Sequence, residues 1–373
     1  MLANVRRAGA FARTVRGVRR GDALLPRMLT YTVTFTCNAR CVMCDSWRKD
    51  SHGDLTLEDV RRIFAGLPAM DAVRLTGGEP FVRRDLTGIA EAALEFLRPA
   101  FLHVTTNGFL TDRIVEFCER RPRTVPLNLL VSIDGVEGKH DEIRGHRGAF
   151  RSAMRTLETL APRRKELRLN LAVNQTVVDA AGAAQYRELH ERLAPLDIVN
   201  QVVVAYRESA TYSLAHETNV APNYPGHFEP FEGISPAQLE TLFKEIEADL
   251  PGYAPADRAA KKYYLDGIRN RLLARAPDPN PPCVALRAHM RIFPNGDVPV
   301  CQFNSRRLGN LREHSFEDLW FGPDATFWRN WVRMCSGCWA ECEVLPSAVY
   351  SGDLLRHAFK LPAPASRPKP SHA

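Results

Sequence analysis

The sequence predicts an α/β protein with a six-stranded parallel βα sheet, followed by a small cysteine-rich C-terminal domain. The sheet is either a partial (βα)6 barrel of the TIM-like type, the architecture we adopt, or a doubly wound sheet. Short apolar segments alternate with amphipathic helical stretches from residue 28 to residue 206, which is typical of a parallel βα sheet. Eight of the nine cysteines fall into two groups, at residues 37–44 and 283–342. A chain of 373 residues suits one large and one small domain, because single cores rarely exceed about 250–300 residues.

Six segments form the predicted strands, and several are apolar at consecutive positions, as parallel strands covered on both faces should be. They are residues 29–35, 73–76, 101–105, 127–133, 168–173 and 198–204. Between them, helices are predicted at residues 85–97, 111–120, 149–160 and 183–193. A further helix begins with a capping box at Thr56 and places Val60, Ile63 and Phe64 on its buried face.

The remaining boundaries follow changes in composition. Residues 207–233 are polar and rich in Pro, Gly and aromatic residues, which predicts either a loop over a substrate or a surface linker. Helices resume at 236–250 and 255–273, and a run of prolines up to residue 282 marks a boundary. We therefore expect a basic segment (1–27), the barrel (28–206), a linker (207–282), the cysteine domain (283–348) and a Pro-rich tail (349–373) that is disordered from about residue 361.

Positive charge is concentrated at the N-terminus. Of the net charge of +7, residues 1–27 carry +6, so the rest of the chain gives no general case for nucleic-acid binding. A helix over residues 1–20 would place arginines on one face and Phe11, Val15 and Val18 on the other. This pattern indicates a helix packed on the core, a peripheral contact with an anionic membrane, or a mitochondrial presequence. No secretion signal or membrane-spanning run stands out, so a cytoplasmic location is expected.

Three cysteines follow the first predicted strand. Cys37, Cys41 and Cys44 have spacings of three and two, which let one loop bring three thiolates to a single metal centre. A structural zinc ion or a closed iron–sulfur cubane takes four cysteines, whereas three leave a position open for a ligand. The alternative is a zinc knuckle whose fourth ligand lies elsewhere, such as Asp45 or a distant histidine.

Polar residues end the next strands. The second ends in Gly77-Gly78-Glu79-Pro80, where paired glycines allow close backbone approach and Glu79 offers a carboxylate. The later strand ends supply Asn107, Ser132 and Asn174, with Arg144 in the segment after Ser132. The carboxyl ends of parallel strands are where such folds build active sites.

In this order, these motifs resemble the radical S-adenosylmethionine (SAM) superfamily over roughly residues 28–205. The resemblance implies that Cys37, Cys41 and Cys44 bind a [4Fe–4S] cluster whose open iron chelates SAM. It implies further that the Gly77–Pro80 segment binds the SAM amino group, and that Ser132 and Arg144 contact its ribose and carboxylate. Asn107 and Asn174 are weaker candidates for SAM contacts. Met43 stands where the family commonly has an aromatic residue against adenine, and a flexible thioether can fill similar space.

The last cysteines form a second group: Cys283, Cys301, Cys335, Cys338 and Cys342. Residues 294–297, Pro-Asn-Gly-Asp, predict a hairpin between segments 290–293 and 298–300. With the segment 308–311 and a helix at 315–320, this part resembles the SPASM/twitch domain, which implies an auxiliary [4Fe–4S] cluster. Its ligands would be Cys283, Cys301, Cys335 and Cys338, with Cys342 as a rival for one position, or the group holds a structural zinc. Cys118, on an apolar helical stretch, is interpreted as a buried hydrophobic residue.

The resemblance implies an enzyme, an oxidoreductase or maturase, that cleaves SAM reductively to a 5′-deoxyadenosyl radical and abstracts hydrogen from a substrate. A flavodoxin- or ferredoxin-type protein would supply the electron, and the auxiliary cluster would favour a net oxidation or bond rearrangement. The substrate is either a small metabolite or a peptide. Two other classes of protein stay open: a non-enzymatic zinc-binding scaffold and a pure electron carrier, although a carrier needs neither an open iron nor the Gly77–Pro80 segment.

Overall fold

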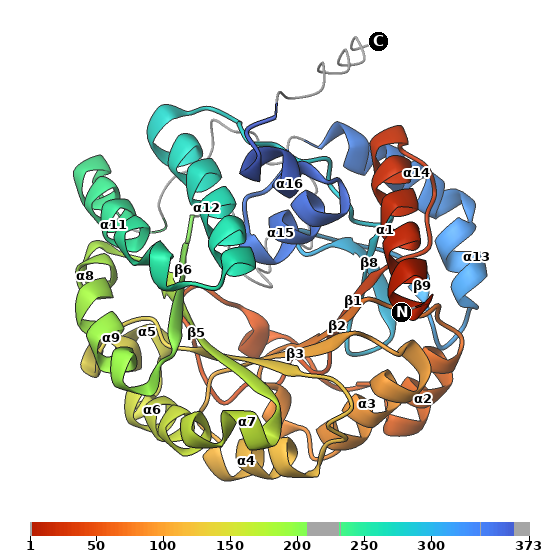
Figure 1. Ribbon diagram of the computed structural model, residues 1–373. Helices are drawn as coiled ribbons and strands as arrows, with labels where there is room; N and C mark the ends of the chain where they lie inside the picture. Colours follow the sequence, from red (N-terminus) through yellow and green to blue (C-terminus); the bar gives the residue numbers. More distant parts are fainter. Residues whose placement is uncertain (1, 207–230, 232, 336, 362–373) are drawn as a thin grey trace.

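The computed structural model describes residues 2–206, 231, 233–335 and 337–361. Its centre is a curved sheet of seven parallel strands in the order β6-β5-β4-β3-β2-β1-β7 (Figure 1). The strands are β1 (Met28–Thr32), β2 (Ala72–Thr76), β3 (Phe101–Thr106), β4 (Leu127–Ser132), β5 (Leu169–Val177), β6 (Val199–Val204) and β7 (His289–Ile292). The partial βα barrel is therefore confirmed, and all six predicted strands are present.

The seventh strand is a correction to the six-stranded prediction. Segment 290–293 was expected to pair within a hairpin, but β7 pairs in parallel with β1, with Thr30 opposite Arg291. The Pro294–Asp297 turn does form, since Phe293 N–H donates to the Asp297 carbonyl at 2.9 Å. The hairpin lies one segment later, between β8 (Asp297–Cys301) and β9 (Asn304–Asn310). The reason is that β1 would otherwise leave a row of unpaired backbone groups at the sheet edge, which β7 covers.

Helices cover the convex face of the sheet (Figure 1). Most of them have one apolar face that packs on the strands, and α2 begins at the predicted Thr56 capping box. These helices are α2 (Leu57–Ala65), α3 (Leu86–Ala92), α4 (Thr111–Arg120), α5 (Gly138–Arg144), α6 (Ala149–Leu160), α7 (Arg164–Leu167), α8 (Ala180–Ala184) and α9 (Tyr186–Leu193). All helices predicted in this part are confirmed. Cys118 is fully buried on α4, as expected.

The later helices lie across the open side of the sheet and beside β7 (Figure 1). They are α11 (Pro236–Asp249), α12 (Pro255–Arg269), α13 (Phe316–Phe321), α14 (Pro323–Met334), α15 (Glu341–Tyr350) and α16 (Asp353–Ala358). Helices α11, α12 and α13 were predicted. Helix α16 lies inside the segment expected as a Pro-rich tail. The disorder expected from about residue 361 and most of the predicted 207–233 loop fall outside the described residues.

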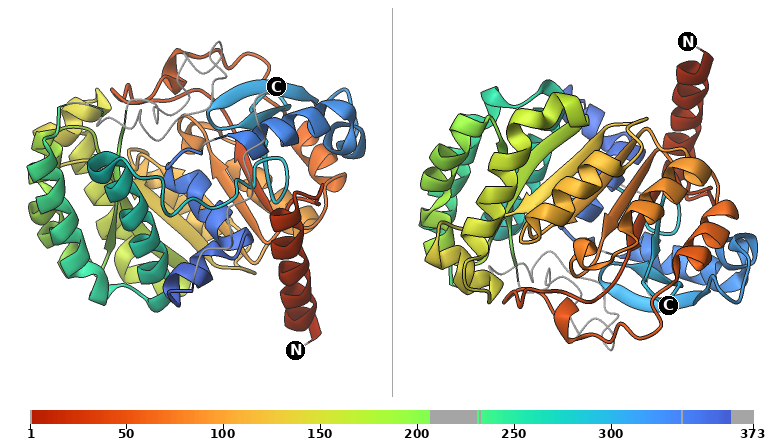
Figure 2. Two further views of the ribbon diagram at one scale, coloured as in Figure 1. Left: turned by 90° about the horizontal axis from the view of Figure 1, so that it is seen from above. Right: turned by 90° about the horizontal axis from the view of Figure 1, so that it is seen from below.

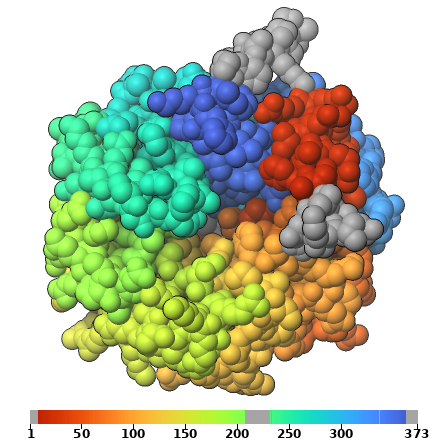
Figure 3. Space-filling model, in the orientation of Figure 1, coloured from red at the N-terminus to blue at the C-terminus, as the bar shows by residue number. Residues whose placement is uncertain are grey.

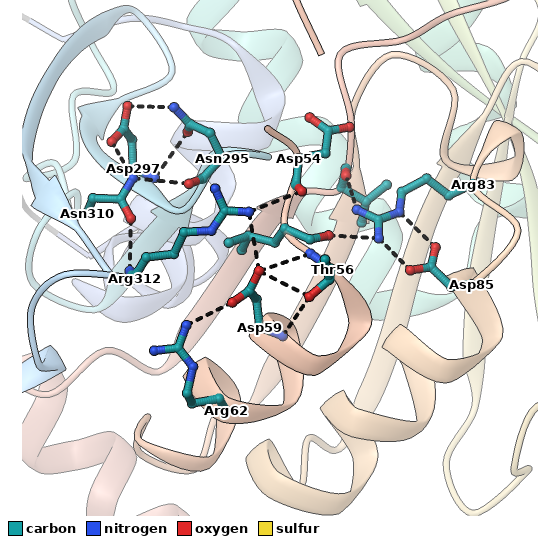
Figure 4. A network of polar contacts seen from close by, with 12 residues as sticks. Asp54, Thr56, Asp59, Arg62, Arg83, Asp85, Asn295, Asp297, Asn310 and Arg312 are labelled. Atoms are coloured by element: carbon teal, nitrogen blue, oxygen red, sulfur yellow. Dashed lines mark hydrogen bonds and ion pairs between the residues drawn. The ribbon is translucent and has the colours of Figure 1, made fainter. Parts of the chain in front are cut away.

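A polar network joins the β8–β9 hairpin to the start of α2 (Figure 4). Arg312 donates to the Asp54 carbonyl and to the Asp59 carboxylate, both at 3.2 Å. Within the hairpin, the Asn310 amide bonds the Asn295 carbonyl and the Asp297 carboxylate. The cysteine domain is thereby fixed against the same edge of the barrel that β7 covers.

Trp339 locks the last part of the chain against α12. Its ring is completely buried over Gly267, and its indole N–H donates to the Tyr264 carbonyl at 2.8 Å. The Arg271 guanidinium lies 3.8 Å from the ring centroid. A Cβ at Gly267 would lie 1.8 Å from the Trp339 ring, so only glycine fits this contact.

We expect Gly267→Ala to lower the free energy of unfolding by at least about 1–3 kcal/mol, because the buried Trp339 ring has no space to move into. Gly252→Ala is the matched control, since a Cβ there meets no atom within 4 Å. Thermal or urea unfolding of both variants measures the difference. Equal stability of the two variants would contradict this packing.

Helix α1 (Leu2–Arg20) packs its C-terminal half on the body and projects from it at the N-terminal end (Figure 2). Val18 is buried, Phe11 meets the Tyr350 ring at 6.0 Å, and Arg19 donates to the Ser351 carbonyl. The space-filling view shows α1 beside the C-terminal helices (Figure 3). The predicted apolar face therefore packs on the protein itself, and contact of residues 1–20 with a membrane stays a prediction. Over the described residues, no helix has the length and apolar character needed to cross a membrane.

Candidate functional site

The three-cysteine loop follows β1 and opens into the barrel. Cys37, Cys41 and Cys44 are all partly buried and line one cavity of about 760 Å³, which we call the lumen cavity. Backbone N–H groups point at two of the sulfurs: Ala39 donates to Cys37 Sγ and Ser46 to Cys44 Sγ, both at 3.4 Å. Donors of this kind stabilise a sulfur that carries negative charge.

The loop is held against α5. Arg40 N–H donates to the Arg144 carbonyl at 2.8 Å, and Val42 N–H donates to the Ile143 carbonyl at 3.0 Å. Gly145, which ends α5 with φ +57°, allows this approach, because a Cβ there would lie 2.7 Å from the Arg40 carbonyl. The positions of the three cysteines are therefore fixed by backbone contacts.

Burial raises the pKa of Cys37 and of Cys44 to about 12, and it raises the pKa of Cys41 as well. Without a cationic partner these groups stay thiols. A metal centre deprotonates the thiols that bind it, so the donor set suits a positively charged cofactor.

The paired glycines serve the cysteine loop. Gly78 N–H donates to the Thr34 carbonyl and Glu79 N–H to the Thr36 carbonyl. A Cβ at Gly77 or Gly78 would lie 2.3 Å from one of these carbonyl oxygens. Both glycines also line the lumen cavity. The close approach predicted from the glycines is thus an approach to the loop that carries Cys37, and a ligand would lie on the other side.

Glu79 is almost completely buried at 1% exposure and does not line the lumen cavity. Its Oε1 accepts from Phe81 N–H and the Thr106 hydroxyl, and its Oε2 accepts from Asn107 N–H at 2.7 Å. Burial raises its pKa to about 7, while these hydrogen bonds oppose the rise. The carboxylate joins the ends of β2 and β3, and Pro80 is buried beside it.

Glu79→Gln tests this bracing role. Each carboxylate oxygen faces a fixed backbone N–H, so a glutamine in either orientation sets its NH2 group against a donor. We expect the variant to lose about 1–3 kcal/mol of unfolding free energy in the absence of SAM. Glu95→Gln, on an exposed ion pair with Arg61, is the matched control and should cost almost nothing. Equal melting temperatures for the two variants would contradict the bracing role.

Arg144 lies beside the three-cysteine loop and lines the lumen cavity. Its Nε forms an ion pair with the fully buried Asp134 at 2.6 Å, and its Nη1 donates to Cys41 Sγ at 3.5 Å. The Asp134 carboxylate raises the pKa of Arg144 against the effect of burial. Asp134 also accepts from Thr176 N–H, and its own N–H donates to His140 Nδ1. Asp134 and His140 therefore position Arg144, a role that the sequence did not assign to them.

The remaining predicted residues share the wall of the lumen cavity. Asn107, Ser132, Asn174 and Met43 all line it, and Ser132 lies opposite Asn174 in the sheet register. The Asn107 amide also donates to Asn38 Oδ1 in the cysteine loop at 2.6 Å. Trp47, three residues after Cys44, lines the cavity too, and its closeness to the three cysteines in the sequence is the signal that points to it.

The second cysteine group comes together from four separate segments. Cys283, before β7, and Cys301, at the end of β8, share one pocket with Cys335 and Cys338, which follow α14. Cys342, at the start of α15, lines the lumen cavity instead. Burial raises the pKa of each of these thiols.

A charged wall separates this pocket from the lumen cavity. Glu343 lines the pocket and forms an ion pair with Arg291, which lines the lumen cavity. His289 contacts the same carboxylate at 3.4 Å and the Thr30 hydroxyl at 2.8 Å. Against the effect of burial, Arg291 lowers the pKa of Glu343 to about 2, so the wall holds a fixed ion pair.

Within the described ranges, no three His, Cys, Asp or Glu side chains are grouped to hold one metal ion. In a cubane cluster each thiolate binds a different iron, so its ligands lie further apart than the ligands of a single ion. One set of three thiols that lines a large cavity, and one set of four that lines a small pocket, fit an open and a fully ligated cluster respectively.

Sequence comparison agrees with the two sites. A sequence model described as the radical SAM superfamily matches residues 31–174, and one described as an iron–sulfur cluster-binding domain, SPASM, matches residues 283–339. The chain is 29% identical over 153 residues to the Fe-coproporphyrin III synthase of Methanosarcina barkeri, which spans 40% of this chain and only 37% of that protein. It is 26% identical over 315 residues to the AdoMet-dependent heme synthase of the same organism, which spans 79% of this chain and 82% of that protein.

Among solved structures, Streptococcus suis SuiB bound to the precursor peptide SuiA is similar, with a TM-score of 0.57. The two chains are 16% identical, and the match covers 84% of this chain and 69% of SuiB. At this identity the similarity shows a shared fold.

Proposed function

Because the chain belongs to the radical SAM superfamily and carries a C-terminal SPASM domain, we propose that it abstracts hydrogen from a small-molecule substrate inside the lumen cavity. One observation carries the proposal: the three-cysteine loop, the strand-end polar residues and the segment around Cys342 all face one cavity. Its volume of about 760 Å³ lies within the range of roughly 300–1,000 Å³ that is typical of small-molecule sites.

Cys37, Cys41 and Cys44 would hold the SAM-binding [4Fe–4S] cluster. When reduced, that cluster supplies the electron that divides SAM into methionine and a 5′-deoxyadenosyl radical. The protein's own side chains would orient SAM. Arg144 offers a guanidinium to its carboxylate, and Ser132 offers a hydroxyl to its ribose. Asn107, just after β3, and Asn174, on β5, offer amide groups. Gly77 and Gly78, which line the lumen cavity, would contact the amino group through their backbone.

Cys283, Cys301, Cys335 and Cys338 would hold the auxiliary [4Fe–4S] cluster, since these four share one pocket. Cys342 is then free of the cluster and faces the substrate. A cluster held in this pocket would lie across the Arg291–Glu343 wall from the lumen cavity, and it would supply an electron acceptor for a net oxidation. A flavodoxin- or ferredoxin-type donor would reduce the first cluster.

We propose that the substrate is a small molecule rather than a peptide. SuiB was solved with a precursor peptide, whereas the two relatives from M. barkeri are named for Fe-coproporphyrin III and heme. Here residues from all seven strands line the lumen cavity, and α15 lies across its open side. A chamber of this kind holds a radical among protein side chains, which suppresses side reactions.

The test is anaerobic purification, reconstitution with iron and sulfide, and incubation with SAM and dithionite. We expect two clusters per chain and the formation of 5′-deoxyadenosine and methionine. Colourless protein that holds zinc and forms no deoxyadenosine under any reductant would overturn the proposal and support a zinc scaffold.

A further inference from the structure

A continuous polar layer crosses the floor of the lumen cavity, away from the three-cysteine loop. On β1 and its neighbours, Thr30 lies in register with Arg74 and Arg291, Arg74 with His103, His103 with Asn128, and Asn128 with Asn170. All six side chains line the lumen cavity. The next lumen-facing positions, Leu130 and Ala172 among them, are less polar. Barrel interiors of this kind are normally filled by branched apolar side chains, so a polar layer is an exception that needs a cause.

Arg74 is the central cation of this layer. Its Nη1 donates to the Cys342 carbonyl at 3.1 Å, and its Nε is buried with no hydrogen-bond partner among the described residues. The two nearby carboxylates are engaged elsewhere: Glu343 with Arg291 and Glu341 with Lys261, the latter at 2.9 Å. Arg74 is partly buried, and a cation held away from water without a carboxylate partner is destabilising unless a ligand compensates its charge.

The neighbours of Arg74 within this layer add neutral donors, and the carboxylates that act on its charge, Glu343 and Glu341, are the two already paired. His103 contacts the Thr105 hydroxyl at 3.1 Å, and burial beside Arg74 lowers its pKa to about 3, so it is neutral. Asn170 donates to Asn128 Oδ1 at 2.8 Å, which leaves the amide N–H groups of Asn128 for another acceptor. One guanidinium flanked by amide and imidazole groups is the donor set that proteins use for oxyanions.

We propose that Arg74 and Asn128 bind an oxyanion group of the substrate, a carboxylate or a phosphate, on the floor of the lumen cavity. This inference rests on the proposed function, because it takes the lumen cavity as the substrate chamber. Arg74 lies four residues before Gly78 on the same chain segment, which corresponds to roughly 13 Å along an extended strand. The substrate is therefore an anionic molecule held by one end, and the carbon that loses hydrogen lies several bonds from the anionic group.

Calorimetric titration of the reconstituted protein tests the inference without SAM or reductant. The probes are succinate, inorganic phosphate and the neutral succinamide. We expect at least one of the two anions to bind more tightly than succinamide, and Arg74→Gln to weaken that binding about tenfold or more. The anion that binds identifies the oxyanion as carboxylate or phosphate. Arg120→Gln, on an exposed ion pair of α4, is the matched control and should bind as the wild type does.

A second variant covers the case in which Arg74→Gln does not fold. Asn128→Asp sets a negative charge at a half-buried lumen position beside the layer, and we expect it to abolish anion binding by repulsion. Binding by neither anion, or equal binding by wild type and a folded variant, would overturn the inference. Wild-type protein that binds an anion but forms no deoxyadenosine would refute the proposed function alone, and the opposite result would refute the anion subsite alone.

Discussion

Replacing Cys37, Cys41 and Cys44 together by alanine should abolish the formation of 5′-deoxyadenosine and remove about half of the bound iron. Loss of a single outer partner of a metal ligand already costs roughly 10–100-fold in affinity or activity, and this variant removes every protein ligand of the first cluster. The loop itself should keep its path, because its backbone bonds to Arg144 and Ile143 do not use the cysteine side chains. Product analysis by chromatography and iron counting measure both effects.

Cys118→Ala is the matched control for that variant. Cys118 is fully buried on α4 among apolar residues and lines neither cysteine cavity. Its replacement should leave iron and deoxyadenosine unchanged and cost only the stability of a small cavity. Deoxyadenosine formed by the triple variant at the wild-type rate would refute the assignment of the first cluster.

The strands could be predicted because apolar residues predominate in most of them, and the errors lie where polar residues accumulate at a strand end. Strand β5 was expected to end at residue 173 but continues to Val177. Its extension contains Asn174 and Thr176, which line the lumen cavity, and the fully buried Gln175, which pairs with Asn200. In a sequence, polar side chains that face a ligand cavity resemble those of a surface loop, because no local pattern distinguishes the two.

Helix α15 could not be predicted for a related reason. Pro346 lies inside it and cannot donate to the carbonyl of Cys342, four residues earlier. Arg74, from β2, supplies the missing donor at 3.1 Å. The helix therefore depends on a contact between residues 268 positions apart, which no local pattern contains.

The candidate site was predictable as a set of residues, but less so as a set of roles. Spacing located the cysteines, and strand-end polarity located the residues that line the lumen cavity. The glycines and Glu79 were assigned to SAM, yet their observed partners are the cysteine loop and the end of β3. Contact with SAM and contact with the cysteine loop require the same residue types, so the sequence alone does not distinguish these two roles. Arg74 and His103 were missed because each is a single polar residue inside an apolar strand.

Single alanine variants of the second cysteine group should divide into two classes. Cys283, Cys301, Cys335 and Cys338 share one pocket, so each of these variants should lose the auxiliary cluster and about half of the iron. Cys342→Ala should retain both clusters, because its side chain lines the lumen cavity. Iron counting and the electron paramagnetic resonance of the reduced protein distinguish the two classes, and Cys342→Ala serves as the internal control.

The division into two classes follows from the topology of the two cavities. A ligand to a cluster in the small pocket must approach from its side of the Arg291–Glu343 wall, and Glu343, one residue after Cys342, already occupies that wall. Consecutive residues at the start of α15 point in different directions, about 100° apart around the helix. Cys342 therefore lines the lumen cavity, and Glu343 lines the small pocket. Iron lost from Cys342→Ala, with iron retained in Cys338→Ala, would exchange their assignments and require α15 to turn on binding the cluster.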